Sequence, residues 1–187
     1  CVGRIRYLGV LLYDASKIEE TAKKPDLELV DAQRDMILDP FDEDVIKEAK
    51  KNGIADSTIK AAQNSPVYKF VKEWGVALPP HVEYRTLPML FYVPPMLPVM
   101  SAQEGGSVRS LNEEYFPDFD KARVPIKYLA SMFGGGNESH LRYVLRKQSA
   151  IRAYRRALTV GDVDLLQAEK SLLAADCNPK EAEEMYK

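Results

Sequence analysis

The sequence has 187 residues, 45% of them hydrophobic and 29% charged, which is typical of a globular chain and excludes a disordered one. Its 26 Lys and Arg against 28 Asp and Glu leave a formal charge of −2, so we expect no nucleic-acid partner. No stretch of the sequence approaches the roughly 18 consecutive apolar residues that cross a bilayer.

The first predicted element is a buried strand over residues 5–13, which are almost continuously apolar, β-branched or aromatic. Asp14 then fits a helix N-cap, and residues 17–24 are predicted to form a short polar helix that ends at Pro25.

Residues 27–74 are predicted to form several short helices. One begins with the acids of residues 42–44 and ends with two lysines before Asn52 and Gly53, an order that complements the helix dipole. A second short helix restarts at Asp56 or Ser57.

A third helix begins at Ser65 and Pro66, which fit the N-cap and the first helical position, and ends at Gly75. Its apolar residues fall at i, i+3, i+4 and i+7, and this spacing predicts an α-helix with a single apolar stripe of Val67, Phe70, Val71 and Trp74.

Residues 79–98 contain six of the twelve prolines, which predicts an extended, stiff arm. Within this arm, residues 87–93 are apolar on both faces and are predicted to form one buried extended segment, which Pro88 confines to an edge or to a strand start. Such an arm either crosses its own core or wraps another surface, and we favour the crossing.

The C-terminal part is predicted to be helical. Pro125 begins a helix that runs through Phe133, and residues 134–136 are three glycines that we interpret as a hinge. Asn137 caps the longest helix, over about 138–158, and two shorter helices follow at about 163–175 and from Pro179. The apolar face of the longest helix is formed by Leu141, Val144, Leu145, Ile151, Tyr154 and Leu158, and six bases fill the rest: Arg142, Arg146, Lys147, Arg152, Arg155 and Arg156.

Charge is also segregated along the chain. Residues 14–56 hold thirteen acids and seven bases, whereas residues 138–158 hold six bases and one acid. Such segregation suits docking between subunits.

Candidate chemistry centres on Cys1. The four potential metal ligands Cys1, Cys177, His81 and His140 lack the close spacing of a self-contained zinc site. A terminal cysteine can serve as nucleophile with its own amine as base, but the helical pattern lacks the two-sheet scaffold of such hydrolases. Cys1 also fits a last iron–sulfur ligand that leads directly into a strand, with Gly3, Arg4 and Arg6 close by.

Several blocks resemble the β subunit of membrane-bound respiratory nitrate reductase. They are C-V-G-R-I-R-Y-L-G-V-L-L-Y-D-A (residues 1–15), D-A-Q-R-D-M-I-L-D-P (31–40), A-A-Q-N-S-P-V-Y-K (61–69), E-Y-R-T-L-P-M (83–89) and Y-V-P-P (92–95). The blocks are in order and the resemblance covers nearly the whole chain. It departs from the family at Phe91, where members carry tryptophan, around His81 (Pro80 and Val82), and at the three glycines.

The resemblance implies an iron–sulfur polyferredoxin with three 4Fe-4S clusters and one 3Fe-4S cluster. This subunit would relay electrons from a haem-b membrane subunit (γ) to a molybdenum-containing subunit (α) that reduces nitrate. Cys1 matches the last cluster-ligating cysteine of the family, and we identify no catalytic residue in the chain. The other ligands are expected upstream, and because one cysteine cannot hold a cluster, the isolated chain is expected to be iron-free.

We therefore predict an α+β chain, mainly helical, with a short ferredoxin-type strand at the N-terminus, a proline-rich extended arm and C-terminal helices. Residues 1–14 are assigned to the end of the iron–sulfur domain and residues 15–187 to a C-terminal helical domain. The expected location is the cytoplasmic face of the cell membrane, through partner subunits. The alternatives are the β subunit of nitrite oxidoreductase, a stand-alone interaction domain without redox role, and the terminal-nucleophile hydrolase. The sequence immediately upstream of Cys1 would separate the last two alternatives from the electron-transfer hypothesis.

Overall fold

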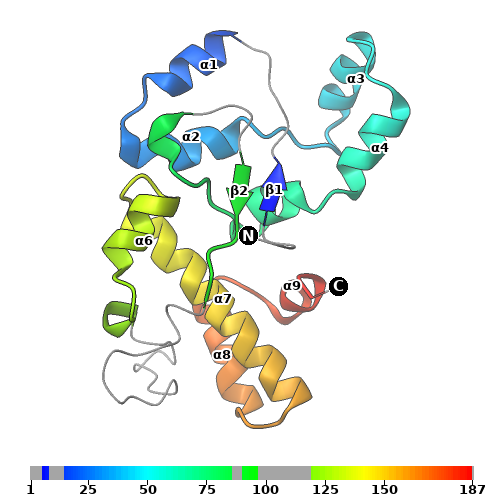
Figure 1. Ribbon diagram of the computed structural model, residues 1–187. Coiled ribbons are helices and arrows are strands. Elements are labelled where there is room, and N and C mark those ends of the chain that lie inside the picture. The colour runs from blue at the N-terminus through cyan, green and yellow to red at the C-terminus, as the bar shows by residue number, and fades with distance from the viewer. Residues whose placement is uncertain (1–5, 9–14, 86–89, 97–118, 187) are drawn as a thin grey trace. The chain divides into compact units, whose positions relative to one another are not determined.

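The computed structural model describes residues 6–8, 15–85, 90–96 and 119–186. Helices dominate these residues and two short strands pair in a small sheet, which confirms the predicted α+β, mainly helical class (Figure 1). The chain divides into two compact units: Cys1–Val93 with Phe133–Gly135, and Pro94–Met132 with Gly136–Lys187. The predicted domain boundary after residue 14 lies outside the described residues.

The sheet of the first unit joins β1 (Arg6–Leu8) to β2 (Leu90–Tyr92) in antiparallel register. Leu78 forms a further bridge with Tyr92, in which the backbone N–H of each residue donates to the carbonyl of the other at 2.8 Å. The middle strand residue, Phe91, is fully buried. β2 is therefore held by two segments that are distant in the sequence.

Each strand falls within a predicted segment. Of the strand expected over residues 5–13, Arg6–Leu8 is observed and residues 9–14 lie outside the described part. The segment expected over 87–93 is extended at Leu90–Tyr92, where Phe91 is fully buried and its two neighbours are partly exposed, while residues 87–89 lie outside the described part. The expectation of burial on both faces is wrong because alternate side chains of a strand point to opposite sides.

The helices of the first unit follow the sequence signals closely. Asp42 caps α3, since its Oδ1 accepts hydrogen bonds from the backbone N–H groups of Asp44 at 2.8 Å and Val45 at 3.1 Å. Gly53 follows the helix with φ of 78°, a left-handed conformation that favours glycine. The helices are α1 (Ala15–Ala22), a 3₁₀ turn (Asp26–Glu28), α2 (Leu29–Asp35), α3 (Glu43–Lys51) and α4 (Asp56–Asn64).

Part of the α-helix expected from Ser65 to Gly75 is instead a π-helix, which has a wider turn. Lys69–Glu73 is a π-helical turn, and the N–H of Trp74 donates to the carbonyl of Lys69 at 2.7 Å. Two further hydrogen bonds hold the chain where it leaves this turn. In both, the carbonyl of Phe70 accepts from a backbone N–H group, that of Val76 and that of Ala77, each at 3.0 Å.

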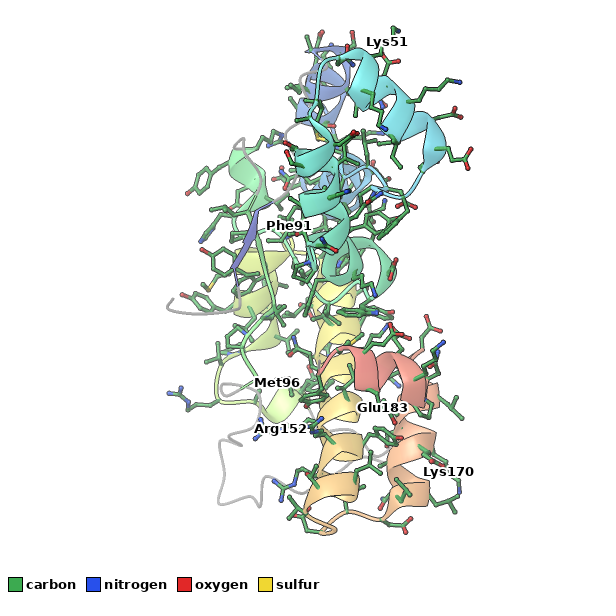
Figure 2. The ribbon with its side chains drawn as sticks, turned by 90° about the vertical axis from the view of Figure 1, so that its right-hand side faces the viewer. Lys51, Phe91, Met96, Arg152, Lys170 and Glu183 are labelled. Carbon is green, nitrogen blue, oxygen red and sulfur yellow. The ribbon has the colours of Figure 1, made fainter. Side chains whose placement is uncertain are left out.

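The core of the first unit joins the π-helical turn, the end of α2 and β2. The buried members of this core are Met36, Ile37, Val71, Ala77 and Phe91. Figure 2 labels Phe91 on β2.

The second unit contains a hairpin of α7 and α8, with α8 lying beside α7 (Figure 1). Its helices are α6 (Ile126–Phe133, whose last residue belongs to the first unit), α7 (Glu138–Thr159), α8 (Leu165–Ala174) and α9 (Pro179–Glu184). Asn137, Asp164 and Asn178 each cap the following helix through a side-chain oxygen, which confirms the cap predicted at Asn137.

The apolar face predicted for α7 is largely confirmed. Five of its six members are buried, whereas Leu158 is 51% exposed near the turn to α8. The core that α7 shares with α8 and α9 contains Ala150, Ile151, Tyr154, Ala168, Leu172, Ala175, Cys177 and Ala182.

The middle one of the three glycines, Gly135, lies in a close contact. Gly135 has φ of 56°, and a Cβ at this position would lie 2.5 Å from the carbonyl oxygen of Asp26 and 3.0 Å from Cγ1 of Val82. Packing within the first unit therefore requires glycine at Gly135, and the hinge interpretation of the three glycines stays a prediction.

No described helix is both long and apolar enough to cross a membrane.

Candidate functional site

Cys1, the candidate cluster ligand, lies outside the described residues. What the structure describes is β1, the strand that begins five residues after it. The contacts that hold β1 are therefore the described part of the candidate site.

The support for β1 reaches across the whole first unit. β1 pairs with β2, and β2 is bridged to Leu78. The segment before Leu78 is fixed by Arg34 of α2, whose Nη2 donates to the carbonyl of Gly75 at 2.7 Å and to that of Ala77 at 3.0 Å. One guanidinium group thus positions the backbone that carries the sheet.

The other potential metal ligands are divided between the two units. His81 belongs to the first unit, where its Nδ1 lies 3.0 Å from Oε1 of Glu83, whereas His140 and Cys177 belong to the second. Within the described ranges, no group of three or more His, Cys, Asp or Glu side chains is arranged to hold a metal ion.

Cys177 is a buried thiol between α8 and α9, 5% exposed. The pKa of Cys177 is raised from 9.0 to about 11, first by burial and then by the nearby Glu181 carboxylate, whereas Lys147 acts to lower it. The thiol is therefore protonated at neutral pH and poorly suited to act as nucleophile or metal ligand.

Beside this thiol lies a buried ion pair that the sequence reasoning missed. Nζ of Lys147 on α7 is 2.6 Å from Oε1 of Glu181 on α9, and the Lys147 side chain is only 2% exposed. Burial alone would lower the pKa of Lys147, but its hydrogen bond to Glu181 and the neighbouring charges raise it above 10.5.

The burial of Lys147 corrects the expectation that it lies outside the apolar face of α7. A signal for its burial was present in the sequence, since Lys147 follows Val144 by three residues and precedes Ile151 by four, and so lies on the apolar stripe. A partner for the charge could not be read from the same pattern, because Glu181 lies 34 residues away.

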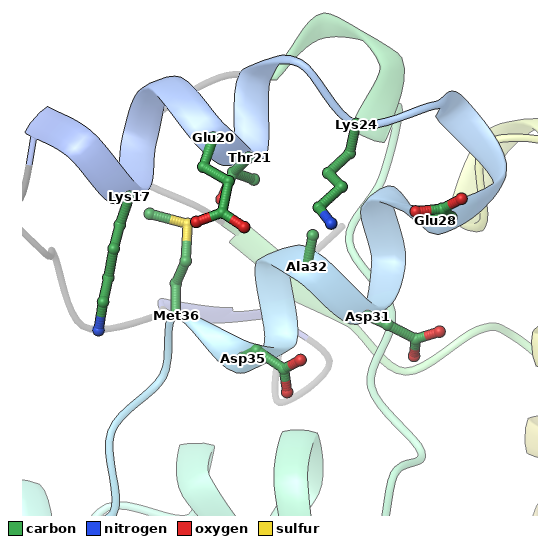
Figure 3. A pocket seen from close by; sticks show the side chains of 9 residues that line it. All are labelled: Lys17, Glu20, Thr21, Lys24, Glu28, Asp31, Ala32, Asp35 and Met36. Carbon is green, nitrogen blue, oxygen red and sulfur yellow. The ribbon is translucent and has the colours of Figure 1, made fainter.

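The first unit also contains an open cleft of about 490 Å³ between α1 and α2. Figure 3 shows the side chains of both signs that line it, with Glu20 and Lys24 pointing toward α2 and Met36 reaching from the end of α2 toward α1. Two lysines face four carboxylates, and the cleft contains no thiol, imidazole or hydroxyl–base pair that would perform nucleophilic chemistry. It is lined by Lys17, Glu20, Thr21, Lys24, Glu28, Asp31, Ala32, Asp35 and Met36.

The sequence of this chain is similar to the sequences of one protein family. Residues 96–175 match the family model described as respiratory nitrate reductase beta C-terminal. The nitrate reductase beta chain of Bacillus subtilis is 50% identical over 159 residues, 84% of this chain and 33% of the relative. The respiratory nitrate reductase 1 beta chain of Escherichia coli is 46% identical over 189 residues, 100% of this chain and 36% of the relative.

Similarity extends to a protein named for a different oxyanion. The chlorate reductase subunit beta of Ideonella dechloratans is 43% identical over 75 residues, 40% of this chain and 20% of that protein. The chain spans about a third of the length of the two nitrate reductase relatives.

Proposed function

Because this chain belongs to the respiratory nitrate reductase beta-subunit family, we propose that it works within an electron-transfer subunit. In this proposal the intact subunit relays electrons through iron–sulfur clusters, from a haem-b membrane subunit to a molybdenum-containing catalytic subunit that reduces nitrate. The supporting observation is 46% identity to the Escherichia coli beta chain along the entire sequence.

In this proposal Cys1 supplies one cluster ligand. The chain has two cysteines, and the second, Cys177, is buried with a raised pKa, whereas a cluster needs deprotonated thiolates. The remaining ligands therefore come from outside this sequence, and we propose three 4Fe-4S clusters and one 3Fe-4S cluster for the intact subunit. When bound, the clusters supply the redox chemistry.

The role of the described residues is to fix the strand that follows this ligand. Arg34 and the Leu78 bridge support β2, and β2 supports β1. A rigid strand limits the movement of a ligand attached to it, which favours a constant distance between redox centres.

The oxyanion substrate is assigned to the catalytic subunit. This chain is similar to a beta subunit named for chlorate reductase and to one, in Thauera selenatis, named for selenate reductase. Similarity across these names supports a shared electron-transfer role rather than recognition of one substrate. We further propose that the subunit lies at the cytoplasmic face of the membrane and attaches there through its haem-b partner.

The ligand role is tested by replacing each cysteine in the intact subunit. Cys1→Ala is expected to remove the electron paramagnetic resonance signal of one cluster and to lower the iron content accordingly. Cys177→Ala is the matched control and is expected to leave both unchanged. A full set of cluster signals in the Cys1→Ala complex would overturn the assignment.

A further inference from the structure

A three-residue segment of the C-terminal half of the chain belongs to the first unit. Residues 126–132 of α6 lie in the second unit, whereas Phe133–Gly135 is part of the first, and the chain returns to the second unit at Gly136. The backbone N–H of Gly136 donates to the carbonyl of Ala130 at 3.1 Å, which closes the end of α6. Phe133–Gly135, which we call the inserted segment, is therefore fixed to α6 at both of its ends.

The inserted segment contacts β2 through an aromatic ring. Phe133 is 8% exposed, and its ring centroid lies 6.5 Å from that of Tyr92 with an angle of 52° between the ring planes. Aromatic rings attract each other at this distance. Phe91, the preceding residue of β2, belongs to the core of the first unit. Because neighbouring side chains of a strand point to opposite sides, Phe133 contacts the side of β2 opposite to this core.

The other end of the inserted segment packs on a firmly held 3₁₀ turn, Val82–Tyr84. A Cβ at Gly135 would lie 3.0 Å from Cγ1 of Val82, and the Val82 side chain is only 1% exposed. Arg85, which follows the turn, donates through Nη2 to Oδ1 of Asp26 at 3.0 Å. Its φ of 50° is strained for a residue with a side chain and persists only where the surrounding contacts enforce it. The turn therefore gives Gly135 a fixed support.

Tyr92 connects the inserted segment to the strand that follows Cys1. Its backbone exchanges two hydrogen bonds with Leu78, and in the sheet it pairs with Arg6 of β1. We propose that Phe133 is a positioning residue for the cluster ligand, because it holds Tyr92 and Tyr92 holds β1. Through this contact α6 restrains the strand that follows the ligand. The inference rests on the proposed function, which assigns Cys1 to a cluster.

Restraint of a ligand has a chemical effect at an iron–sulfur cluster. The reduction potential of a cluster depends on hydrogen bonds to its sulfurs and on its exposure to solvent, and both change when the backbone that bears a ligand moves. Phe133 acts on the cluster only through Tyr92 and β1. Replacing Phe133 is therefore expected to alter the signal of one cluster and to leave the number of bound clusters unchanged.

The first test measures amide hydrogen exchange in the chain with Phe133→Leu, which removes the ring and keeps most of the apolar volume. Exchange at Leu78 and Tyr92 is expected to be about fivefold faster than in wild type, which corresponds to the loss of one aromatic pair. The amide of Ile46, in α3, donates to a carbonyl outside this path and is expected to stay within about twofold. Phe119→Leu is the matched control, because Phe119 is 6% exposed in the second unit, and it should leave Leu78 and Tyr92 protected.

The second test records electron paramagnetic resonance spectra of the intact complex. The cluster signal that Cys1→Ala removes is expected to change its g-values in Phe133→Leu, because the ligand is held differently. The same signal should be as in wild type in Phe119→Leu. A merely structural role of Phe133 would lower stability without changing this signal.

Three outcomes would overturn the inference, and they differ in what they leave standing. Equal acceleration at Ile46 and Tyr92 would mean that Phe133 contributes only to general stability. Unchanged g-values in the Phe133→Leu complex would separate Phe133 from the cluster ligand and leave the proposed function intact. A full set of cluster signals in the Cys1→Ala complex would contradict the proposed ligand and, with it, the positioning role of Phe133.

Discussion

Lys147 and Glu181 form a buried ion pair that joins α7 to α9, with 2.6 Å between Nζ and Oε1. α9 contains only six residues, Pro179–Glu184, and so short a helix is not stable by itself in water. Its attachment therefore depends on tertiary contacts, of which this pair and the adjoining Cys177 are central.

Replacing Lys147 with methionine is expected to lower the free energy of unfolding by about 3 kcal/mol. The apolar stem is kept, but the Glu181 carboxylate, whose side chain is 19% exposed, is left without its cation. Urea denaturation measures the change. Lys170→Met, on the exposed side of α8, is the control and is expected to stay within about 0.5 kcal/mol of wild type. A Lys147→Met protein as stable as wild type would show that the pair contributes nothing net.

Stability is expected to fall in the alkaline range. Burial raises the pKa of Cys177 to about 11, and the pKa of Lys147 is raised above 10.5, so the folded chain holds both protons more tightly than the unfolded chain. The thiol contribution, about 3 kcal/mol, is complete below pH 9 and is lost as the pH rises through 11. Denaturation at a series of pH values should show this decline, and Cys177→Ala should flatten it. An identical slope in the variant would assign the decline to other groups.

Gly135→Ala is expected to destabilise the protein more than an equivalent change at an open glycine. Alanine at Gly135 brings Cβ to 2.5 Å from the Asp26 carbonyl oxygen, in addition to the strain of a positive φ. Gly53 also has a positive φ, 78°, but a Cβ there meets nothing within 4 Å. Gly53→Ala should therefore cost about 1 kcal/mol and Gly135→Ala at least twice as much in thermal unfolding. Equal losses would mean that the backbone at Gly135 shifts without cost.

Arg34→Met is expected to loosen the sheet through the segment it holds. The carbonyls of Gly75 and Ala77 lose their guanidinium donor, a change of about 2 kcal/mol. Amide hydrogen exchange should then accelerate at Leu78 and Tyr92, which form the bridge to β2. Arg152→Met, at an exposed position of α7, is the control and should leave these two amides protected. Unchanged protection in Arg34→Met would show that the bridge does not depend on the guanidinium.

The cysteine assignments show where sequence reasoning stops. Cys1 was identified from its resemblance to a family motif, and because it lies outside the described residues its role stays a prediction. Cys177 lies between the ends of α8 and α9, and its high pKa follows from burial beside Glu181. Burial of that kind depends on how α8 and α9 pack.

The sequence by itself determined the features that depend on residues within one or two helical turns. The caps at Asp42 and Asn137 and the left-handed turn at Gly53 are local, because each needs only the neighbouring backbone. The resemblance to the family was also present in the sequence blocks that occur in order within residues 1–95.

Only the tertiary structure decided the features that join distant segments. Leu90–Tyr92 pairs with Arg6–Leu8 across more than 80 residues, and the contact between Gly135 and Asp26 spans more than 100. The position of Lys147 on an apolar stripe can be seen in the sequence. Its buried charge is tolerated only because Glu181 of another helix pairs with it. Such pairings depend on which surfaces meet after folding, and local periodicity does not contain that information.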